Sequence, residues 1–382
     1  MGMQKVDQHA ELECQISPRL RNSYDIAFFF LHLKRHIMNT TLPTTHQRWE
    51  IPSLGLDKLA LRDLPLPQPK TGEIVIATEA VSLNYRDAEV VDHGMGNPLV
   101  FPFTPASDMA GRVVAVGAGV TRFAVGDRVL SAYMPGWIDG VPLSWSEAPT
   151  RGGPLSGVLS QYVVDSAEWY VHAPRNLSAA EASTLPVAAL TAWMALVELG
   201  KLHAGQTVVV QGTGGVSLFA VQLAAAHGAR VIVTSGSDEK IARAIALGAH
   251  HGINRNATPD WHQEVLALTG GRGADHILEM TGGENVERSL RAVVQGGRIS
   301  IIGLLDANTF TLPILPVLGS RASIIGIAVG PRRALEDLVR AVELLGIRPV
   351  IDASYPFAQV PAAFAHLQRG AFGKIVVQVA EK

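Results

Sequence analysis

Short apolar runs broken by glycine and proline dominate the chain from residue 48 to residue 171. Two of these runs, at 73–85 and 109–120, have the length of strands and alternate apolar with polar or small residues. The pattern predicts a mainly β region. Residues 137–160 are rich in glycine, proline and serine, which predicts a long loop of the kind that borders a binding site.

The hydrophobic period changes near residue 172. Residues 177–200 read as helical, with Ser178 as the N-cap and Glu181 completing a capping box. Strand and helix patterns then alternate as far as residue 305, which predicts a parallel sheet with helices on both faces. The final stretch adds one more helical pattern and a closing strand.

Composition and charge limit the class of protein. The chain has 382 residues, enough for two domains, and its 47% hydrophobic and 17% charged residues are typical of a folded, soluble protein. Because 32 basic residues nearly balance 34 acidic ones, no overall field would attract nucleic acid or an anionic membrane. We therefore expect a small-molecule substrate and neither of those partners.

The N-terminal residues 1–47 form an extension outside these patterns. Its apolar run at 26–31 is too short to span a membrane, and no signal-cleavage pattern follows. The segment is either a genuine extension or the product of an upstream start codon, with Met38 as the true start; we favour the second. Cys14 is the only cysteine, so disulfides within the chain and thiolate metal clusters are excluded, which fits a cytoplasmic location.

A glycine turn follows the first strand of the alternating region. The sequence G-x-G-x-x-S after 208–211 opens an amphipathic helix, so backbone N–H groups and the helix dipole would face a pyrophosphate. Serine at 217 replaces the third glycine of the fingerprint and remains small enough for helix–strand packing. The alternative is a helix-entry turn without a ligand. The predicted contacts are Gly212, Thr213, Gly214, Gly215 and Val216.

The end of the second strand indicates which dinucleotide binds. An acidic residue there would bind ribose hydroxyls and repel the 2′-phosphate of NADP, but this strand ends at Ser235. Ser237, Lys240 and Arg255 add a donor and two cations, whereas Asp238 and Glu239 fall in the first turn of the next helix. We therefore predict NADP(H). Lys240 and Arg255 could instead be ordinary solvated charges.

Six segments carry a family resemblance: "AVSLNYRDAEV", "FTPASDMAGRVVAVGAGV", "GDRV", "STLPVAALTAWMAL", "GTGGVSLFAVQLA" and "ALGAHHGIN". From about residue 48 the chain resembles the medium-chain dehydrogenase/reductase superfamily, and most of all its zinc-free quinone oxidoreductase branch. The resemblance implies an α/β fold with a GroES-like catalytic domain at 48–171 and a Rossmann NADP-binding domain at 172–328. Residues 329–382 would return to the catalytic domain.

The zinc-binding residues of that superfamily are missing from the corresponding positions. Asn84 stands where the zinc members have a cysteine, and Ala106, Ser107 and Asp108 stand where they have Gly-His-Glu. We predict no catalytic metal, because thiolate and imidazole ligands are absent there. The adjacent histidines at 250 and 251 lie between a helix and a strand and do not form an alternative site.

The resemblance also implies roles for individual residues. Tyr85 would bind or protonate the substrate, or merely anchor its loop; Asn84 would hold the nicotinamide ribose or a substrate carbonyl; Ser107 is a weaker catalytic candidate. Arg86 and Asp87 would form a loop-fixing ion pair. Further cofactor contacts would be Thr191, Thr281, Gly303, Ala328 and Lys374. An apolar lid, or else ordinary core or loop, would be formed by Tyr133, Met134, Trp137 and Trp145.

Hydride transfer creates negative charge on the acceptor, and no metal ion would stabilise that charge here. A conjugated acceptor delocalises the charge, so it needs less stabilisation from the protein. We predict reduction of a quinone or an α,β-unsaturated carbonyl by NADPH. The alternatives are a zinc-independent alcohol or aldehyde dehydrogenase and a non-catalytic NADPH-binding protein. By analogy, residues 321–330 would form an edge strand that pairs two subunits in a homodimer.

Overall fold

A computed structural model describes residues 42–141, 143–144 and 146–380, and residues from Thr44 onward form one compact unit. Predictions about Cys14, the Met38 start and Trp145 fall outside the described residues. None of the helices in the described ranges is long and apolar enough to cross a membrane.

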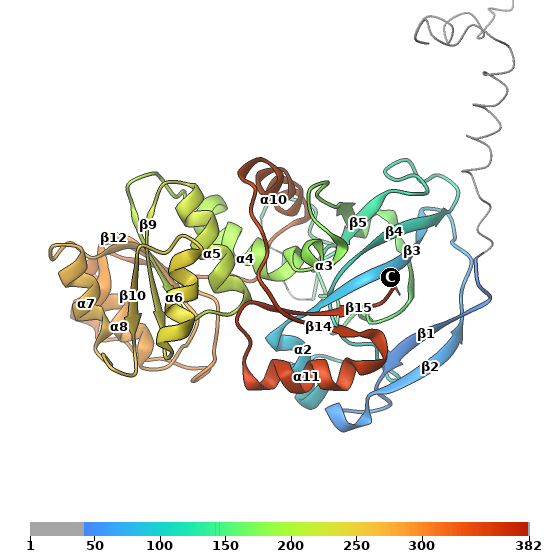
Figure 1. Ribbon diagram of the computed structural model, residues 1–382, viewed down its shortest axis with the longest axis horizontal. Coiled ribbons are helices and arrows are strands. Elements are labelled where there is room, and N and C mark those ends of the chain that lie inside the picture. The colour runs from blue at the N-terminus through green and yellow to red at the C-terminus, as the bar shows by residue number, and fades with distance from the viewer. Residues whose placement is uncertain (1–41, 142, 145, 381–382) are drawn as a thin grey trace, which may run out of the picture. The chain divides into compact units, whose positions relative to one another are not determined.

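A mixed sheet organises the β-rich half (Figure 1). Its strands run in the order β14-β15-β3-β4-β5-β7, with β6 pairing on β3, and β1 and β2 form a separate hairpin. The last strand, β15, is antiparallel to β3, so the C-terminus completes a sheet begun near residue 73. The bounds are β1 Thr45–Glu50, β2 Ala60–Pro65, β3 Glu73–Leu83, β4 Asp108–Val116, β5 Arg128–Ser131, β6 Tyr162–Ser166, β7 Tyr170–His172, β14 Ile351–Pro356 and β15 Lys374–Gln378.

The other half is a parallel sheet with the order β10-β9-β8-β11-β12-β13, as predicted from the alternation of strands and helices. Its central strands are buried along their length, which is typical of strands covered on both faces. The strands are β8 Thr207–Gln211, β9 Arg230–Ser235, β10 His251–Asn254, β11 Ala274–Glu279, β12 Val293–Ile301 and β13 Ser323–Gly326. The helices are α5 Gly215–Ala226, α6 Asp238–Ala246, α7 Trp261–Leu268, α8 Asn285–Ala292 and α9 Ile314–Ser320.

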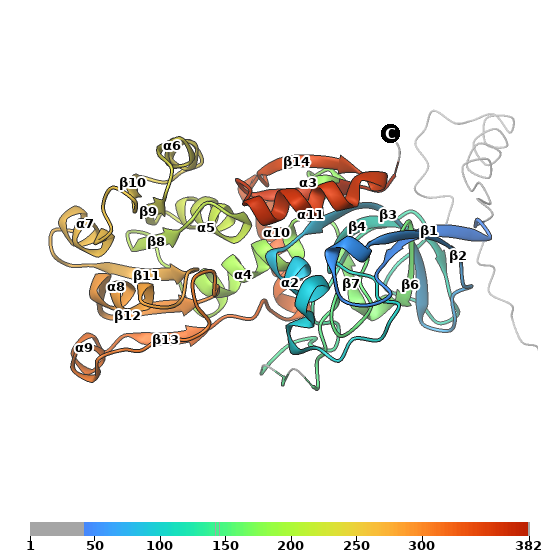
Figure 2. The same cartoon turned by 90° about the horizontal axis from the view of Figure 1, so that it is seen from below.

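The remaining helices lie outside that alternation (Figure 2). They are α2 Tyr85–His93, α3 Ala179–Ala182, α4 Leu190–Trp193, α10 Arg332–Leu345 and α11 Val360–Arg369, with π-helical segments at Leu185–Ala189 and Met194–Glu198. Short 3-10 turns lie at Leu56–Lys58, Gly94–Gly96, Ala167–Trp169 and Phe357–Gln359. The capping box before α3 is confirmed, since the hydroxyl of Ser178 accepts from Glu181 N and Glu181 Oε2 accepts from Ser178 N at 2.8 Å. The fold class predicted from the sequence is therefore correct.

One apolar core is shared by both halves, and it includes three of the residues that were predicted to form a lid. Tyr133, Met134 and Trp137 are only 5%, 4% and 5% exposed and belong to the cluster that contains Leu190 of α4 and Leu335 of α10. Side chains packed this tightly cannot swing over a substrate, so the lid assignment is wrong for these three residues and the core alternative is right.

Candidate cofactor and active site

The glycine turn lies at the point in the parallel sheet where the strand order reverses direction. β8 and β11 are central neighbours, with β9 and β10 on one side and β12 and β13 on the other. Open α/β sheets bind ligands at the carboxyl ends of the strands at such a switch point. Gly212 directly follows β8, and Thr281 lies just beyond β11, so these two predicted cofactor contacts come from neighbouring strand ends.

The turn itself fits a pyrophosphate. Gly212 has φ 76°, a left-handed conformation that glycine adopts freely, and α5 begins at Gly215 with its first N–H groups unpaired within the helix. A Cβ added at Gly214 would meet no atom within 4 Å, so the space beside it is open to a ligand. The hydroxyl of Ser217 donates to Gln211 O at 2.8 Å, which joins α5 to β8 where the fingerprint has glycine.

A buried polar network that the sequence analysis missed ties β8 to β11 below this turn. The fully buried carboxylate of Glu279 accepts hydrogen bonds from Gln211 Nε2 at 2.9 Å, from Asn285 Nδ2 and from the hydroxyl of Ser289. Gln211 Oε1 in turn accepts from the hydroxyl of Thr281 at 3.3 Å. The network fixes Thr281 at the switch point. The available signal was a polar residue, Gln211 or Glu279, directly after an apolar run at the end of each of two strands.

The end of β9 has the predicted uncharged character. Ser235 is 5% exposed, and its hydroxyl accepts from Ser237 N at 3.4 Å. Ser237 is the N-cap of α6, accepting from Lys240 N, and Asp238 begins that helix as predicted. Lys240 is partly buried and Arg255 is exposed, which is compatible with both the cofactor role and the solvated-charge alternative.

The start of β15 reaches the glycine turn from the far end of the chain. Gly373 N donates to Thr213 O at 3.0 Å, and Gly373 pairs with Gly214 as an isolated bridge. The aliphatic chain of Lys374 then passes over the turn, because a Cβ built at Gly215 would lie 2.5 Å from Lys374 Cδ. Glycine at 215 is therefore required by a lysine distant in sequence, a reason that the fingerprint alone does not reveal.

The ammonium group of Lys374 ends in the β-rich half. It donates to Leu83 O at 2.7 Å and to Asn84 Oδ1 at 2.6 Å, and the residue is only 4% exposed. The structure thus brings a predicted cofactor contact and a predicted catalytic residue together. A contact between Lys374 and the pyrophosphate or ribose stays a prediction.

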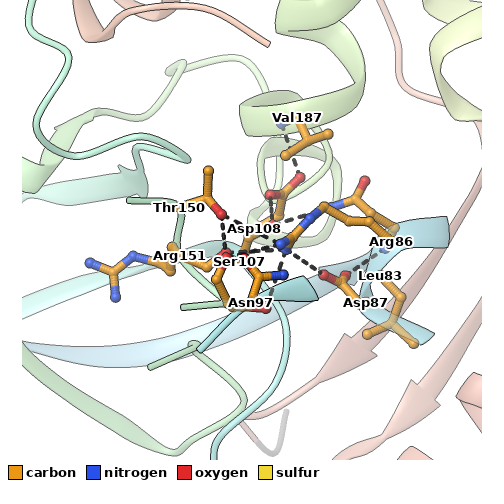
Figure 3. A network of polar contacts seen from close by, with 12 residues as sticks. Leu83, Arg86, Asp87, Asn97, Ser107, Asp108, Thr150, Arg151 and Val187 are labelled. Carbon is orange, nitrogen blue, oxygen red and sulfur yellow. Dashed lines mark hydrogen bonds and ion pairs between the residues drawn. The ribbon is translucent and has the colours of Figure 1, made fainter. Parts of the chain in front are cut away.

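Asn84, Ser107 and Asp108 continue the chain of contacts, part of which Figure 3 shows. Asn84 Nδ2 lies 3.4 Å from Ser107 Oγ, which donates to Asp108 Oδ1 at 2.6 Å, and Asp108 Oδ2 accepts from Val187 N at 3.0 Å. Ser107 is fully buried and commits its proton to Asp108. It therefore supports Asn84 and cannot donate to a substrate.

Burial shapes the electrostatics of this cluster. Burial raises the pKa of Asp108, opposed chiefly by the Lys374 cation, and raises the pKa of Asp87 to about 6, opposed chiefly by Arg86. Burial lowers the pKa of Lys374, while the charges of Asp108 and Asp87 act in the opposite direction. Two carboxylates and two cations share a dry environment, so each charge depends on the others.

Arg86 fixes the loop beside this cluster. Its guanidinium lies 3.5 Å from Asp87 Oδ1, which confirms the predicted ion pair, and Asp87 Oδ2 accepts from Asn84 N at 2.8 Å. Arg86 also donates to the carbonyl oxygens of Arg151, Gly152 and Gly153 (Figure 3). Asp87 therefore holds the backbone N–H of Asn84, and Arg86 ties the start of α2 to the loop at 151–153.

The other predicted residues are more dispersed. Tyr85 is 49% exposed at the start of α2, so the alternative in which it is a buried anchor is wrong. Burial, and then Glu89, raises the pKa of its phenol. Thr191 is buried in α4, Gly303 packs so closely that a Cβ would lie 2.1 Å from Met280 O, and Ala328 is exposed. The cofactor roles of these three residues remain predictions.

Comparison with known proteins identifies the family. Models of an alcohol dehydrogenase GroES-like domain and a zinc-binding dehydrogenase domain match residues 70–175 and 215–344. A zinc-type alcohol dehydrogenase-like protein of Schizosaccharomyces pombe is 38% identical over 85% of this chain and 96% of its own length. The crystal structure of a candidate alcohol dehydrogenase from Sinorhizobium meliloti 1021 is 54% identical, with a TM-score of 0.85 over 89% of this chain and 100% of that one. The chain belongs to the medium-chain dehydrogenase/reductase superfamily.

This medium-chain dehydrogenase/reductase is also similar to human quinone oxidoreductase, at 26% identity over 85% of this chain and 94% of the human protein. The superfamily consists of oxidoreductases that bind a nicotinamide dinucleotide, and the glycine turn described above fits that cofactor.

The zinc named in one matched domain does not fit the residues of this chain. An amide and a hydroxyl, at Asn84 and Ser107, are poor zinc ligands, and the Lys374 ammonium already binds the amide oxygen. No group of three or more histidine, cysteine or acidic side chains that could hold a metal ion occurs in the part of the chain that the structure describes.

Proposed function

We propose that this protein is a zinc-independent oxidoreductase that uses NADPH to reduce a quinone or an α,β-unsaturated carbonyl compound. The observation that carries the proposal is the buried ammonium of Lys374, 2.6 Å from Asn84 Oδ1. The Lys374 ammonium group thus lies beside Asn84, the residue at the position where zinc-binding members of the superfamily have a cysteine ligand. It supplies positive charge but no open coordination position for a substrate oxygen.

Lys374 also determines which way the Asn84 amide faces. Because Oδ1 accepts from the ammonium, Nδ2 must be the donating end. The Nδ2 donor lies 3.4 Å from Ser107 Oγ, a long contact, and the side chain also hydrogen-bonds the carboxylate of Asp108, so an acceptor oxygen would have to compete with these two partners for it. A donor fixed in this way stabilises the charge that develops on a substrate carbonyl.

Tyr85 is suited to deliver the proton. Its phenol is half-exposed at the start of α2, next to Asn84, and carries its proton at neutral pH, although burial and Glu89 raise its pKa and so make it a weaker acid. When bound, the nicotinamide cofactor supplies the hydride. A conjugated acceptor matches this modest set of donors better than a simple ketone does, since it spreads the developing charge over several atoms.

The preference for NADPH rests on the end of β9. Ser235 carries no charge, and Asp238, which begins α6, has Oδ1 engaged by Asn254 Nδ2 at 2.8 Å. Lys240 and Arg255 supply nearby positive charge without an acidic residue at the strand end. We expect Ser235→Asp to abolish the preference for NADPH over NADH, a change of about tenfold or more, equal to ~1.4 kcal/mol.

Steady-state assays with NADPH and NADH against quinones, enones, saturated ketones and aldehydes test the proposal. Rapid reduction of quinones or enones by metal-free protein supports it. Activity confined to saturated aldehydes or ketones would establish the second candidate, a dehydrogenase of the kind named in the S. pombe and S. meliloti relatives. Activity that disappears with chelation and returns with zinc would disprove zinc independence.

We further propose a homodimer formed through the edge of the parallel sheet. β13 is the edge strand, and the neighbouring α9 exposes Ile314, Leu315 and Leu318 at 74%, 80% and 66%. Such an apolar surface beside an unpaired strand edge favours association with a second copy. Light scattering on the full chain tests this, and Leu315→Glu should shift the mass towards that of a monomer.

A further inference from the structure

A stacked arginine lies beside the proposed cofactor site. The guanidinium of Arg243, from α6, lies over the ring of Phe372, with its Cζ 3.7 Å from the ring centroid. Phe372 belongs to the segment between α11 and β15, so the stack connects the parallel-sheet half with the C-terminal part of the β-rich half. Neither residue was among the cofactor contacts predicted from the sequence.

Phe372 is held next to the glycine turn. The residue is 3% exposed, and its N–H donates to Asp352 Oδ2 at 3.2 Å. The following residue, Gly373, donates its own N–H to Thr213 O at 3.0 Å. The ring under the guanidinium is therefore one residue away from a direct bond to the turn that fits the pyrophosphate.

Arg243 reaches this ring from the start of α6. Its Nη1 lies 3.9 Å from Oε1 of Glu239, the second residue of the helix, so the guanidinium is close to the first turn. Side chains on a helix lean towards its N-terminus, which brings the cation to that level. Since β8 and β9 pair side by side, with Gln211 opposite Thr234, the turns that follow them are neighbours. Sheets of this kind hold the pyrophosphate at the first turn and the adenosine ribose at the second.

The guanidinium is accessible and only weakly engaged. The side chain of Arg243 is 44% exposed, and Glu239 is its only ion-pair partner among the described residues. Their 3.9 Å separation is too long for a hydrogen bond, and the side chain of Glu239 is 82% exposed, so solvent screens the pair. Stacking on Phe372 fixes the plane of the guanidinium and leaves its edges open. A planar fork held in this way suits two oxygens of one phosphate group.

A second cation lies beside Arg243 on the helix. Lys240 precedes it by three positions, which makes the two side chains neighbours on the surface of α6. Lys240 is partly buried in the first turn of the helix. The acid that begins the helix, Asp238, has Oδ1 engaged by Asn254 Nδ2 at 2.8 Å. Positive charge is therefore available to a ligand at the start of α6.

We propose that Arg243 recognises the 2′-phosphate of NADPH, keeping one face on Phe372 while a free edge donates to two phosphate oxygens. Lys240 supplies a second positive charge beside it. The inference rests on the NADPH-dependent function proposed above and adds a residue that determines cofactor specificity. The uncharged strand end at Ser235 permits the phosphate, and Arg243 selects it.

Two small probes isolate this contact, because adenosine 2′,5′-bisphosphate and adenosine 5′-monophosphate differ only in the 2′-phosphate. Isothermal titration calorimetry on the full chain, at constant ionic strength, measures both affinities without any electron acceptor. The wild type should bind the bisphosphate more tightly by about tenfold or more, as charge-assisted hydrogen bonds to a phosphate allow. Equal affinity for the two probes would overturn the NADPH preference itself, and the role of Arg243 with it.

Three variants locate the recognition. Arg243→Met should lower bisphosphate affinity about tenfold and leave monophosphate affinity unchanged, because methionine still covers Phe372. Arg243→Lys keeps the charge without the planar fork and should restore only part of the loss. Arg291→Met is the matched control, since Arg291 on α8 is also exposed, at 58%, and also pairs with a glutamate in i,i+4 spacing. It should bind both probes as the wild type does.

Two outcomes would overturn the role of Arg243 while the NADPH preference stands. One is a preference for the bisphosphate that survives unchanged in Arg243→Met. The other is an equal loss of affinity for both probes in that variant, which would mean that Arg243 supports the adenosine and does not distinguish the phosphate.

Discussion

The glycine turn and the Lys374 cluster are neighbours in space but differ in how the sequence encodes them. The turn is formed by consecutive residues, from Gln211 to Ser217. The cluster joins the end of β3, the start of β4 and the start of β15, and its 2.6 Å contact between Lys374 and Asn84 links residues 290 positions apart. A local motif can be found by inspection, whereas the cluster exists only when two halves of the chain have folded together.

The two regions also differ in what holds them together. The turn uses backbone conformation and leaves its N–H groups open for a ligand. The cluster is buried and charged, and the charge of each ionisable member is balanced by the opposite charge of another. The turn should therefore tolerate changes that spare its backbone, while the cluster should fail when one charge is removed.

Lys374→Met is expected to produce the largest effect. It leaves Asp108 and Asp87 buried without their shared cation and removes the donor to Asn84, which should lower the free energy of unfolding by about 3–5 kcal/mol. Chemical denaturation measures the loss. Lys70→Met, at an exposed lysine of the same half, is the control and should change stability by less than about 0.5 kcal/mol. A similarly small effect at Lys374 would show that its ammonium is not needed.

Asn84→Asp tests the donor without removing the acceptor for Lys374. The carboxylate can still accept from the ammonium, but the Nδ2 donor is gone, so kcat should fall about 10²–10³-fold. Dinucleotide affinity, followed by fluorescence titration, should change little, because the glycine turn is untouched. Equal losses in affinity and kcat would mean that Asn84 serves the cofactor and not the acceptor.

Asp87→Asn tests the electrostatics through pH. The pKa of Asp87 is raised from 3.8 to about 6 in the folded protein, so the folded state binds its proton more tightly than the unfolded state does. The stability from this group is present below pH 4 and is lost as pH rises towards 6, by up to ~3 kcal/mol. Denaturation curves between pH 4 and 7 should show a smaller decline in the variant than in the wild type. Identical slopes would refute the assignment.

Two glycine variants compare the regions most directly and have the smallest effects. Gly215→Ala would push against Lys374 Cδ, so it should reduce both stability and kcat, by about 1–3 kcal/mol of unfolding free energy. Gly214→Ala meets no atom within 4 Å and should leave stability unchanged while weakening dinucleotide binding. Equal stability of the two variants would show that the close approach of Lys374 to residue 215 does not affect stability.

Several features were predictable because they depend on nearby residues. The glycine turn, the capping box at Ser178 and Glu181 and the serine that ends β9 all follow from spacing and local chemistry. The parallel sheet followed from alternating periods. The loop aromatics were harder, since a Gly- and Pro-rich segment predicts exposure, yet Tyr133 and Trp137 are core residues. Burial of a loop side chain depends on what packs over it, which local sequence does not specify.

The sequence by itself determined the fold class and predicted where a dinucleotide would bind, because periodicity and a single turn depend on residues within one or two elements. It also showed that Asn84 and Ser107 stand where zinc ligands would be. Only the tertiary structure placed the Lys374 ammonium on Asn84 and formed the Glu279 network. Those arrangements depend on contacts between distant strands, and chain closure over such separations leaves no periodic trace in the sequence.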